Sequence, residues 1–298
     1  MPLLTGKPWV ADFRDSMTED NYPREGWRRV LWRWIERQAV NRASRLIFTA
    51  ASTRRMYLER YPHLSPAKCV LIPNGYDEED FAHIVVREGP TLAEDRPLRL
   101  LHTGVIYPEE RDPRPFFRAL QRLKHEGKIS AKSVSIVFRA AGSEDLYQRL
   151  MNELNIADLI KLQPHVPYHQ ALQECADADG LLLFQAANCD HQIPAKAYEY
   201  LRLRKPVFAL TTHTGDTATL LTDVGGATIV SLADEEDIYA GLPSFLYAVR
   251  TRTHPLAEVQ KIASYARRNQ AEELARCLSG LRNQAPSATP EKAESFAR

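Results

Sequence analysis

The sequence predicts an α/β protein built on parallel, Rossmann-like sheets. Two observations support this fold class. From about residue 97 onward, six short apolar or β-branched runs alternate with segments whose apolar residues have helical spacing. Strand–helix–strand alternation of this kind builds βαβ units, in which the strands are parallel. The same alternation occurs before residue 90, but there it comprises only three strand-like runs.

Residues 1–88 predict only part of a domain. Strands are expected in "PWVADF", "SRLIFTA" and "KCVLIPNG", and the long helix "GWRRVLWRWIERQAVNRA" joins the first two. Three strands with one or two helices cover too little apolar surface for a free-standing α/β domain. The polar stretch "VREGPTLAEDRP", which holds two prolines, then indicates a linker, placed at residues 89–97.

Residues 98–245 predict a complete Rossmann-like domain. Its six strands are expected in "LRLLHTG", "SVSIVFRAAG", "IKLQPHV", "ADGLLLFQ", "PVFALTT" and "ATIVSL". Helices are expected between them, in "PRPFFRALQRLKHEG", "SEDLYQRLMNELN", "YHQALQECA", "PAKAYEYLRLR" and "DTATLLTDV". Ser143 is the expected N-cap of the second of these helices. The sheet pattern then stops: residues 246–283 are expected to be helical, and residues 284–298 have the polar composition of a disordered tail.

The composition narrows the functional class. The 298 residues carry a formal net charge of +1, which gives no general attraction to nucleic acid. The cysteines lie far apart without a CxxC pair and are expected to be reduced thiols: Cys69, Cys175, Cys189 and Cys277. No apolar run approaches the roughly 20 residues of a membrane span, and the first 15 residues lack the apolar core of a signal peptide. A cytoplasmic protein is expected.

A candidate binding site lies in "IPAKAYEYLRLRKP", which follows the apolar run "GLLLFQ". Ligands of a parallel α/β sheet bind beyond the carboxyl ends of its strands, where the next helices begin. Pro194 suits a first helical turn, and the free N–H groups of Ala195, Lys196 and Ala197 would favour an anion there. The Lys196 side chain adds a positive charge, and Glu199 on the same face could accept two hydroxyl groups of a ribose. The alternative is a helix face exposed to solvent.

A second loop with suitable chemistry follows the first strand of this domain, in "HTGVIYPEERDPRP". Gly104 permits close approach of the backbone to a ligand, and Arg111 can bind a phosphate through two parallel hydrogen bonds. Neither GxGxxG nor GxxxxGK[ST] occurs, so the common dinucleotide and P-loop sites are not expected.

Three tracts resemble, in order, the signatures of GT-B glycosyltransferases of the family 4 type: "VLIPNGYDEEDF" (70–81), "LLHTGVIYPEERDPRPFFRAL" (100–120) and "IPAKAYEYLRLRKPVFAL" (193–210). "YARRNQAEELARCL" also resembles their C-terminal helix, which crosses back to the first domain. The resemblance covers most of residues 8–280. It implies a GT-B fold with a partial N-terminal, acceptor-side domain and a complete C-terminal nucleotide-sugar domain. It further implies sugar transfer from a nucleotide-diphosphate donor to an acceptor hydroxyl, usually with retention.

The resemblance also implies roles for single residues. Lys196 and Arg111 match the cations that bind the diphosphate, where they would neutralise the leaving group. Glu199 matches the glutamate that binds the donor ribose, and Gly104 matches the glycine whose loop approaches the phosphates and the sugar. Apart from the nucleotide sugar itself, which is a substrate, the resemblance implies no cofactor and no metal site.

Other positions match less closely. Val166 and Pro167 lie where the loop after the third strand usually meets the base of the donor. The family often has a second glutamate eight residues before the ribose one, and His191 occupies that position. Arg14, followed by Asp15, stands where many relatives place a histidine near the reacting sugar. A complete first domain would also need roughly another hundred residues before "PWVADFRD", so a fragment, a misassigned start or a second chain is expected.

The helix rich in arginine and tryptophan allows two interpretations. Residues 24–60 contain ten arginines and three glutamates, a net charge of +7, with Trp27, Trp32 and Trp34 interleaved. Such a helix could lie at a membrane surface beside a lipid-linked acceptor, or it could pack its tryptophans on the first-domain sheet. A nucleic-acid face is not expected, because the rest of the chain shows no matching basic stripe.

Two functional classes follow from the sequence. The first is an active glycosyltransferase in polysaccharide or glycoconjugate synthesis, with a glycan or lipid-linked acceptor. The second is a nucleotide-sugar-binding module without turnover, because the acceptor-side domain is incomplete. Both require the same donor site, and they differ only in whether sugar is transferred.

Overall fold

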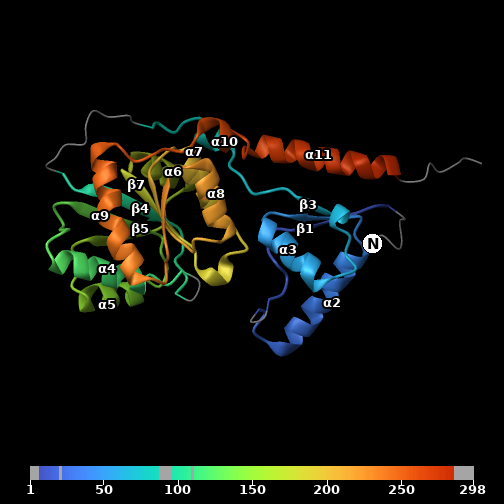
Figure 1. The fold of residues 1–298 in the computed structure, drawn as a ribbon, viewed down its shortest axis with the longest axis horizontal. Helices are drawn as coiled ribbons and strands as arrows, with labels where there is room; N and C mark the ends of the chain where they lie inside the picture. The colour runs from blue at the N-terminus through green and yellow to red at the C-terminus, as the bar shows by residue number, and fades with distance from the viewer. Residues whose placement is uncertain (1–6, 20–21, 87–95, 109–110, 285–298) are drawn as a thin grey trace, which may run out of the picture.

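The computed structural model describes residues 7–19, 22–86, 96–108 and 111–284. The chain forms two parallel sheets, each with its own helices, which lie side by side in Figure 1. The smaller sheet has three strands and the larger has six, as the alternation of the sequence predicts. Together the two sheets give the mixed α/β architecture expected for the chain.

The smaller sheet has the order β1–β2–β3, with strands Val10–Phe13, Arg45–Phe48 and Cys69–Leu71. Helices α2 (Gly26–Arg42) and α3 (Ala51–Arg60) make the two crossovers. The core between sheet and helices is aromatic: the Tyr57 ring lies 4.9 Å from that of Phe13 and 5.0 Å from that of Phe48. Because strands and helices meet on these rings, α3 holds a fixed position on the sheet.

A buried carboxylate joins α2 to the rest of this unit. Glu36 is fully buried, although it lies in the middle of a helix. One of its oxygens accepts hydrogen bonds from Arg60 (2.9 Å) and the Tyr61 hydroxyl (2.6 Å). The other accepts from Thr18 and the Tyr57 hydroxyl, both at 3.0 Å. Burial, with the neighbouring carboxylate, raises the pKa of both tyrosines, so these phenols stay protonated and donate.

The face of α2 opposite Glu36 is exposed and apolar. Its members recur at helical spacing, and each is at least 39% exposed: Trp27, Val30, Leu31, Trp34 and Ile35. Among the tryptophans of this helix, Trp32 is partly buried and meets the Tyr22 ring at 5.7 Å. Packing of the tryptophans on the sheet is therefore wrong for Trp27 and Trp34, which are 68% and 59% exposed.

The larger sheet has the order β6–β5–β4–β7–β8–β9, with all neighbouring strands parallel. The strands are, in chain order, β4 Leu98–Thr103, β5 Val134–Arg139, β6 Ile160–Gln163, β7 Gly180–Phe184, β8 Val207–Leu210 and β9 Ala227–Val230. This confirms all six predicted strands. The order reverses between β4 and β7, so the loops after these strands diverge and leave room for a ligand.

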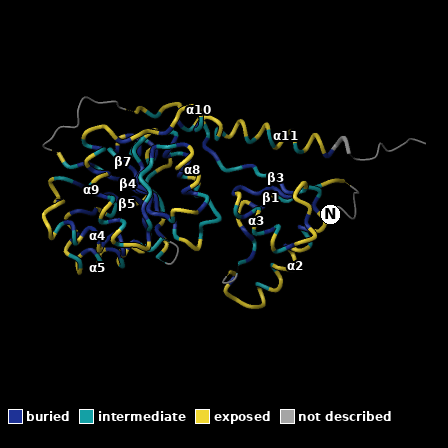
Figure 2. Tube along the Cα trace, in the orientation of Figure 1, coloured by how far each residue is buried: buried dark blue, intermediate teal, exposed yellow. Residues whose placement is uncertain are grey.

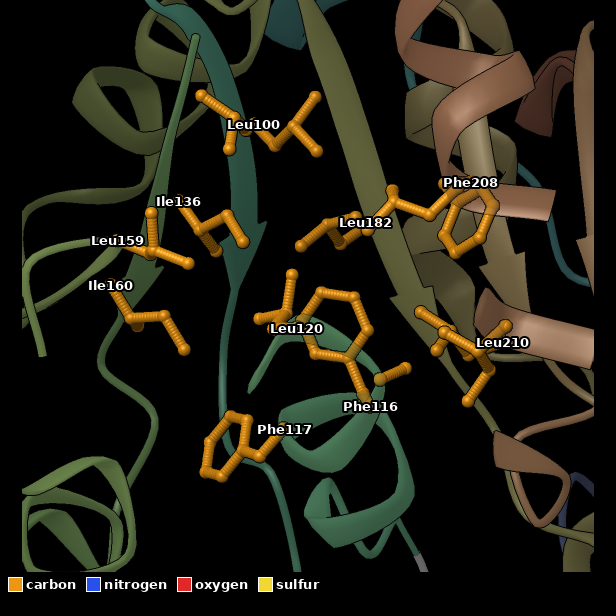
Figure 3. Close-up of a cluster of buried hydrophobic side chains, with 14 of the residues drawn as sticks. Leu100, Phe116, Phe117, Leu120, Ile136, Leu159, Ile160, Leu182, Phe208 and Leu210 are labelled. Atoms are coloured by element: carbon orange, nitrogen blue, oxygen red, sulfur yellow. The ribbon is translucent and has the colours of Figure 1, made fainter. Parts of the chain in front are cut away.

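Helices cover both faces of the larger sheet. They are α4 Arg114–His125, α5 Glu144–Glu153, α6 Tyr168–Asp177, α7 Ala195–Arg202, α8 Asp216–Val224 and α9 Glu235–Thr251. One buried cluster joins α4, α5 and α9 to the sheet, and a second joins α6, α7 and α8 to the other face. Figure 3 shows the first cluster, in which side chains of α4 lie against strand residues: Phe116, Phe117 and Leu120 near Leu100, Ile136 and Leu182. The burial pattern in Figure 2 places the strands of this sheet in the interior.

Three local features differ from expectation. Ser143 occupies the N-cap position of α5, but its φ of 47° is left-handed and its side chain makes no cap hydrogen bond. Pro194 precedes α7 and does not belong to its first turn. The helix α9 begins at Glu235 and continues through Pro243, although helix was expected only from residue 246; the side chain of Asp234 caps it by accepting from the N–H groups of its first turn. The domain boundary expected at residue 245 falls within this helix.

The chain returns to the smaller sheet through α10 (Val259–Ala263) and α11 (Arg267–Gln284), and Figure 1 shows α11 extending past that sheet. Tyr76 fixes the crossing: its N–H donates to the Tyr265 carbonyl at 3.2 Å, and its own carbonyl accepts from the Arg267 N–H at 2.9 Å. A Cβ atom on the preceding Gly75 would lie 2.0 Å from the Tyr265 oxygen, so only glycine fits there.

Short 3-10 turns cover Pro66–Lys68, Glu78–Phe81 and Ala187–Cys189. Among the described residues, none of the helices has the length and apolar character to cross a membrane.

Replacing Glu36 by alanine should lower the free energy of unfolding by about 3 kcal/mol, because the partly buried Arg60 and three hydroxyl groups would lose their acceptor. Urea unfolding followed by circular dichroism measures this. Glu25→Ala is the matched control, since Glu25 lies just before the same helix, is 52% exposed and meets Arg28 at 3.6 Å. Its effect should stay within about 0.5 kcal/mol. Equal losses for the two variants would contradict a structural role for the Glu36 network.

Candidate functional site

The candidate site lies at the carboxyl end of the larger sheet, beside the point where its strand order reverses. The strand β4 ends at Thr103, and Gly104 follows in the loop that leads to α4. The helix α7 begins at Ala195, after the loop that leaves β7. These two segments meet there and bring together side chains that are more than ninety residues apart in the sequence.

Lys196 and Gly104 are in direct contact. Gly104 has a φ of +94°, and a Cβ atom on it would lie 2.9 Å from the Lys196 Nζ. The ammonium donates a hydrogen bond to the Thr103 carbonyl and lies 3.5 Å from the His102 Nε2. Burial, reinforced by the charge of Arg111, lowers the pKa of Lys196 to about 7. The lysine therefore sits where a positive charge is costly until an anion arrives.

Arg111 supplies the second cation. Its guanidinium donates to the Val105 carbonyl at 2.9 Å and lies 5.4 Å from the centre of the Tyr107 ring. Arg111 is close enough for its charge to lower the pKa of Lys196. The structure thus brings Gly104, Arg111 and Lys196 together.

Glu199 lies three residues after Lys196 on the same helix. It accepts a hydrogen bond from the Tyr168 hydroxyl at 2.9 Å, and burial raises its pKa. Tyr168 is the first residue of α6 and directly follows Pro167, which is exposed, and Val166, which is partly buried. Val166 and Pro167 therefore lie beside the site through Tyr168. No sequence motif singles out Tyr168, since a tyrosine at the start of a helix has no functional signature without its partner.

The first turn of α7 offers fewer backbone donors than the sequence suggests. The Ala197 N–H donates to the Pro194 carbonyl at 2.9 Å, so it is not free for a ligand. The expectation that this N–H points at an anion is wrong, because Pro194 lies outside the helix and its carbonyl closes the first turn. Positive charge at this end of α7 comes mainly from the Lys196 side chain.

The loop after β1 faces the larger sheet from the other unit. Arg14 donates to the Asn74 side chain at 3.2 Å, and Asp15 is exposed. Glu19, from the same loop, meets the His191 imidazole at 2.7 Å, and this hydrogen bond lowers the pKa of Glu19. His191, expected near the donor sugar, is thus tied to the smaller unit. The structure brings neither Arg14 nor Asp15 into contact with Lys196.

Further hydrogen bonds join the two units beside His191. The Asp216 carboxylate accepts from the backbone N–H and the hydroxyl of Ser52, each at 2.8 Å. Ser52 lies in the first turn of α3, and Asp216 is the first residue of α8. The Asp216 carboxylate of the larger unit therefore caps the start of α3 in the smaller unit. Thr53 donates to the His191 carbonyl. These contacts join α3 of the smaller unit to the start of α8 and to the loop before α7.

The arrangement suits a ligand with an anionic and a hydroxylated part. Two cations and a glycine turn can hold a diphosphate, and a carboxylate next to them can accept the hydroxyl groups of a sugar ring. Within the ranges that the structure describes, no group of three or more His, Cys, Asp and Glu side chains could hold a metal ion.

Comparison with known proteins finds matches to part of the sequence and to the whole fold. Residues 3–80 match the model of Glycosyltransferase Family 4, while no curated protein sequence matches. Sucrose-phosphate synthase from Thermosynechococcus elongatus is similar in structure, with a TM-score of 0.64 at 14% identity over 92% of this chain and 68% of that one. HepE from Anabaena, solved with UDP and glucose, gives 0.65 at 12% identity over 94% and 73%. A glycosyltransferase from Rickettsia africae gives 0.63 at 11% over 92% and 71%.

The chain has the GT-B fold. The GT-B fold predicted from the three sequence tracts is confirmed, and the match to Glycosyltransferase Family 4 covers the smaller unit, including Asn74 and Gly75. In this GT-B chain the candidate site belongs to the larger, six-stranded unit.

The Gly104→Ala variant should weaken nucleoside diphosphate binding by about tenfold, because the new methyl group displaces the Lys196 ammonium. Gly127→Ala is the matched control: Gly127 also has a positive φ, 71°, but nothing lies within 4 Å of its added Cβ. Both variants should lose about 1 kcal/mol of stability from the left-handed backbone. Titration calorimetry with UDP and thermal unfolding separate the two effects. Equal affinities for UDP in both variants would contradict the contact between Gly104 and Lys196 at the binding site.

Proposed function

We propose that this GT-B protein is a glycosyltransferase, which moves a sugar from a nucleoside diphosphate donor to an acceptor hydroxyl. The observation that supports it is the cluster at the end of β4, in which the Lys196 ammonium and Arg111 flank Gly104. The bond between the anomeric carbon and the diphosphate breaks, and the acceptor oxygen bonds to that carbon. Retention of configuration, which the sequence resemblance implies, is part of the proposal.

Lys196 and Arg111 contribute by neutralising the leaving group. Negative charge grows on the diphosphate as its bond to the sugar breaks, so cations placed there stabilise the transition state more than the ground state. Because these side chains supply the charge, we propose that donor binding needs no bound metal. The low pKa of Lys196, about 7, fits this role: the arriving diphosphate favours the protonated amine.

Glu199 and the loop before α6 hold the nucleoside. The Glu199 carboxylate lies one helical turn from Lys196 and is positioned by Tyr168 at 2.9 Å, which suits the two hydroxyl groups of a ribose. Val166 and Pro167 would then lie next to the base. The complex of HepE with UDP and glucose makes UDP the first nucleotide to test.

The acceptor is proposed to be a glycan or a lipid-linked precursor in polysaccharide or glycoconjugate synthesis, at the cytoplasmic face of a membrane. The exposed apolar face of α2 supports this, because Trp27 and Trp34 are 68% and 59% exposed. Exposed arginines of the same segment flank these rings: Arg24, Arg28, Arg33 and Arg37. Aromatic rings that insert between headgroups and arginines that meet anionic lipids are the two components of an interfacial helix.

The affinity for UDP should fall as pH rises above about 7, because the diphosphate binds the protonated form of Lys196. Between pH 7 and pH 8.5 the loss should be on the order of tenfold, since deprotonation removes up to a factor of ten per pH unit. Titration calorimetry in the presence of EDTA measures it and tests metal independence together.

Lys196→Arg and Lys196→Ala are the controls for this pH dependence. Arginine stays charged, so its variant should bind UDP with nearly constant affinity over this range. The alanine variant should bind weakly at every pH while uridine binding is unchanged. Loss of all binding in EDTA, or the same pH profile in all three proteins, would contradict the proposal. Binding of UDP-sugars without product formation would instead favour the module that binds without turnover.

The double variant Trp27→Ser/Trp34→Ser should reduce binding to vesicles of phosphatidylcholine and phosphatidylglycerol by about tenfold, because two interfacial rings are lost. Sedimentation with the vesicles measures the bound fraction. Tyr247→Ser is the matched control: Tyr247 is 70% exposed, but it lies on α9 in the other unit. Vesicle binding that is insensitive to the tryptophans, or absent in the wild type, would contradict membrane contact through α2.

A further inference from the structure

His102 is a fully buried histidine next to the site, and neither the sequence motifs nor the proposed roles account for it. It lies on β4, two residues before Gly104, with its ring edge-on to those of Phe184 at 5.1 Å and Phe138 at 6.2 Å. A phenylalanine or leucine would fill the same space in such a core. The presence of an imidazole there needs a polar reason, because burying its nitrogens without partners is costly.

The protonation pattern of His102 follows from its contacts. Its Nδ1 lies 2.9 Å from the Leu182 carbonyl on β7. A carbonyl only accepts, so Nδ1 must carry the proton in that hydrogen bond. Burial, together with the charges of Lys196 and Arg111, holds the pKa of His102 well below its usual range, so the ring is neutral. Its Nε2 is therefore a lone pair, and it faces the Lys196 Nζ at 3.5 Å.

Lys196 thus has two acceptors on its inner side, the Thr103 carbonyl and the His102 Nε2. An ammonium has three N–H groups, and the third is left to point away from both acceptors, toward the loop at Gly104. The other ionisable groups that act on Lys196 are Arg111 from the loop after β4, Glu199 on α7 and Cys175 on α6. Arg111 lowers the pKa of Lys196, whereas Glu199 and Cys175 raise it.

We propose that His102 is a positioning residue for Lys196: its Nε2 lone pair orients the ammonium toward the place where the diphosphate of the donor binds. This inference rests on the proposed function in assuming that the anion is a diphosphate. The orientation itself is a property of the protein without its ligand. His102 touches neither donor nor acceptor, and it acts only through the lysine.

Two substitutions separate the two nitrogens of the ring. His102→Asn keeps a donor near Nδ1 for the Leu182 carbonyl but has no atom at Nε2. His102→Gln is one methylene longer and brings its amide oxygen to the region of Nε2, at the expense of the Leu182 hydrogen bond. A structural role alone would make glutamine the more harmful change, whereas positioning of Lys196 makes asparagine the more harmful one.

The first test is a double-mutant cycle with UDP as the probe. His102→Asn should weaken UDP binding on the order of tenfold and leave uridine binding unchanged, and His102→Gln should stay within about threefold of the wild type. In a Lys196→Ala background, His102→Asn should change the UDP affinity by less than about twofold, because the lysine through which it acts is gone. An equal loss in both backgrounds, or an equal loss for uridine, would overturn the proposal.

The second test needs no nucleotide. The chain is labelled with lysine enriched in ¹³C at Cε, and Lys196 is titrated by NMR, its signal being assigned from the Lys196→Arg variant. The midpoint should fall in His102→Asn, because the charged form loses an acceptor, and should stay near the wild-type value in His102→Gln. An unchanged midpoint in His102→Asn would overturn the positioning role even if UDP binds. Failure of the wild type to bind UDP or GDP would overturn the proposed function, and the titration would still decide the role of His102.

Discussion

The enclosure of one ammonium group governs the candidate site of this GT-B protein. Lys196 lies on a helix that starts at the carboxyl end of a parallel sheet, where the backbone of the neighbouring strand presents carbonyl groups. Thr103 and His102 offer acceptors to this positive charge and Glu199 also favours it, but burial still lowers the pKa of Lys196 to about 7. Gly104 is required for the same reason, since any side chain at that position would occupy the space of the ammonium. The glycine, the lysine and the buried histidine are therefore parts of one packing arrangement.

The orientation of α2 follows from a different buried charge. The helix has a continuous apolar stripe, which normally turns toward a core. Here the opposite side faces inward, because Glu36 finds four donors among Thr18, Tyr57, Arg60 and Tyr61. A fully paired carboxylate held by two tyrosines fixes one rotation of the helix about its axis. The apolar stripe, with Trp27 and Trp34, is then left on the surface.

Local patterns predicted most of the fold, and side-chain partners far apart in the sequence explain most of what they missed. All nine strands were expected, because alternation of apolar runs with helical spacing is visible within a few residues. The contact of Lys196 with Gly104 was also foreseeable, since both follow strands that end at the same edge. His102 was not, because a histidine inside an apolar strand looks like part of the core until its two nitrogens are matched to Leu182 and Lys196. Tyr168 and the inward rotation of α2 were hidden in the same way, and the first half of α9 was missed.

The absence of a side chain at Gly75 bears on how the two units can move. The segment that follows β3 passes very close here to the segment that leads into α11. A Cβ atom on Gly75 would lie 2.0 Å from the Tyr265 oxygen. The two crossing segments are also held by paired backbone hydrogen bonds at Tyr76. Sliding of one unit past the other would break that pairing, whereas rotation about the crossing keeps it. The crossing at Gly75 therefore opposes sliding between the two units, and the hydrogen bonds of Ser52 with Asp216 and of Glu19 with His191 tie the same units together elsewhere.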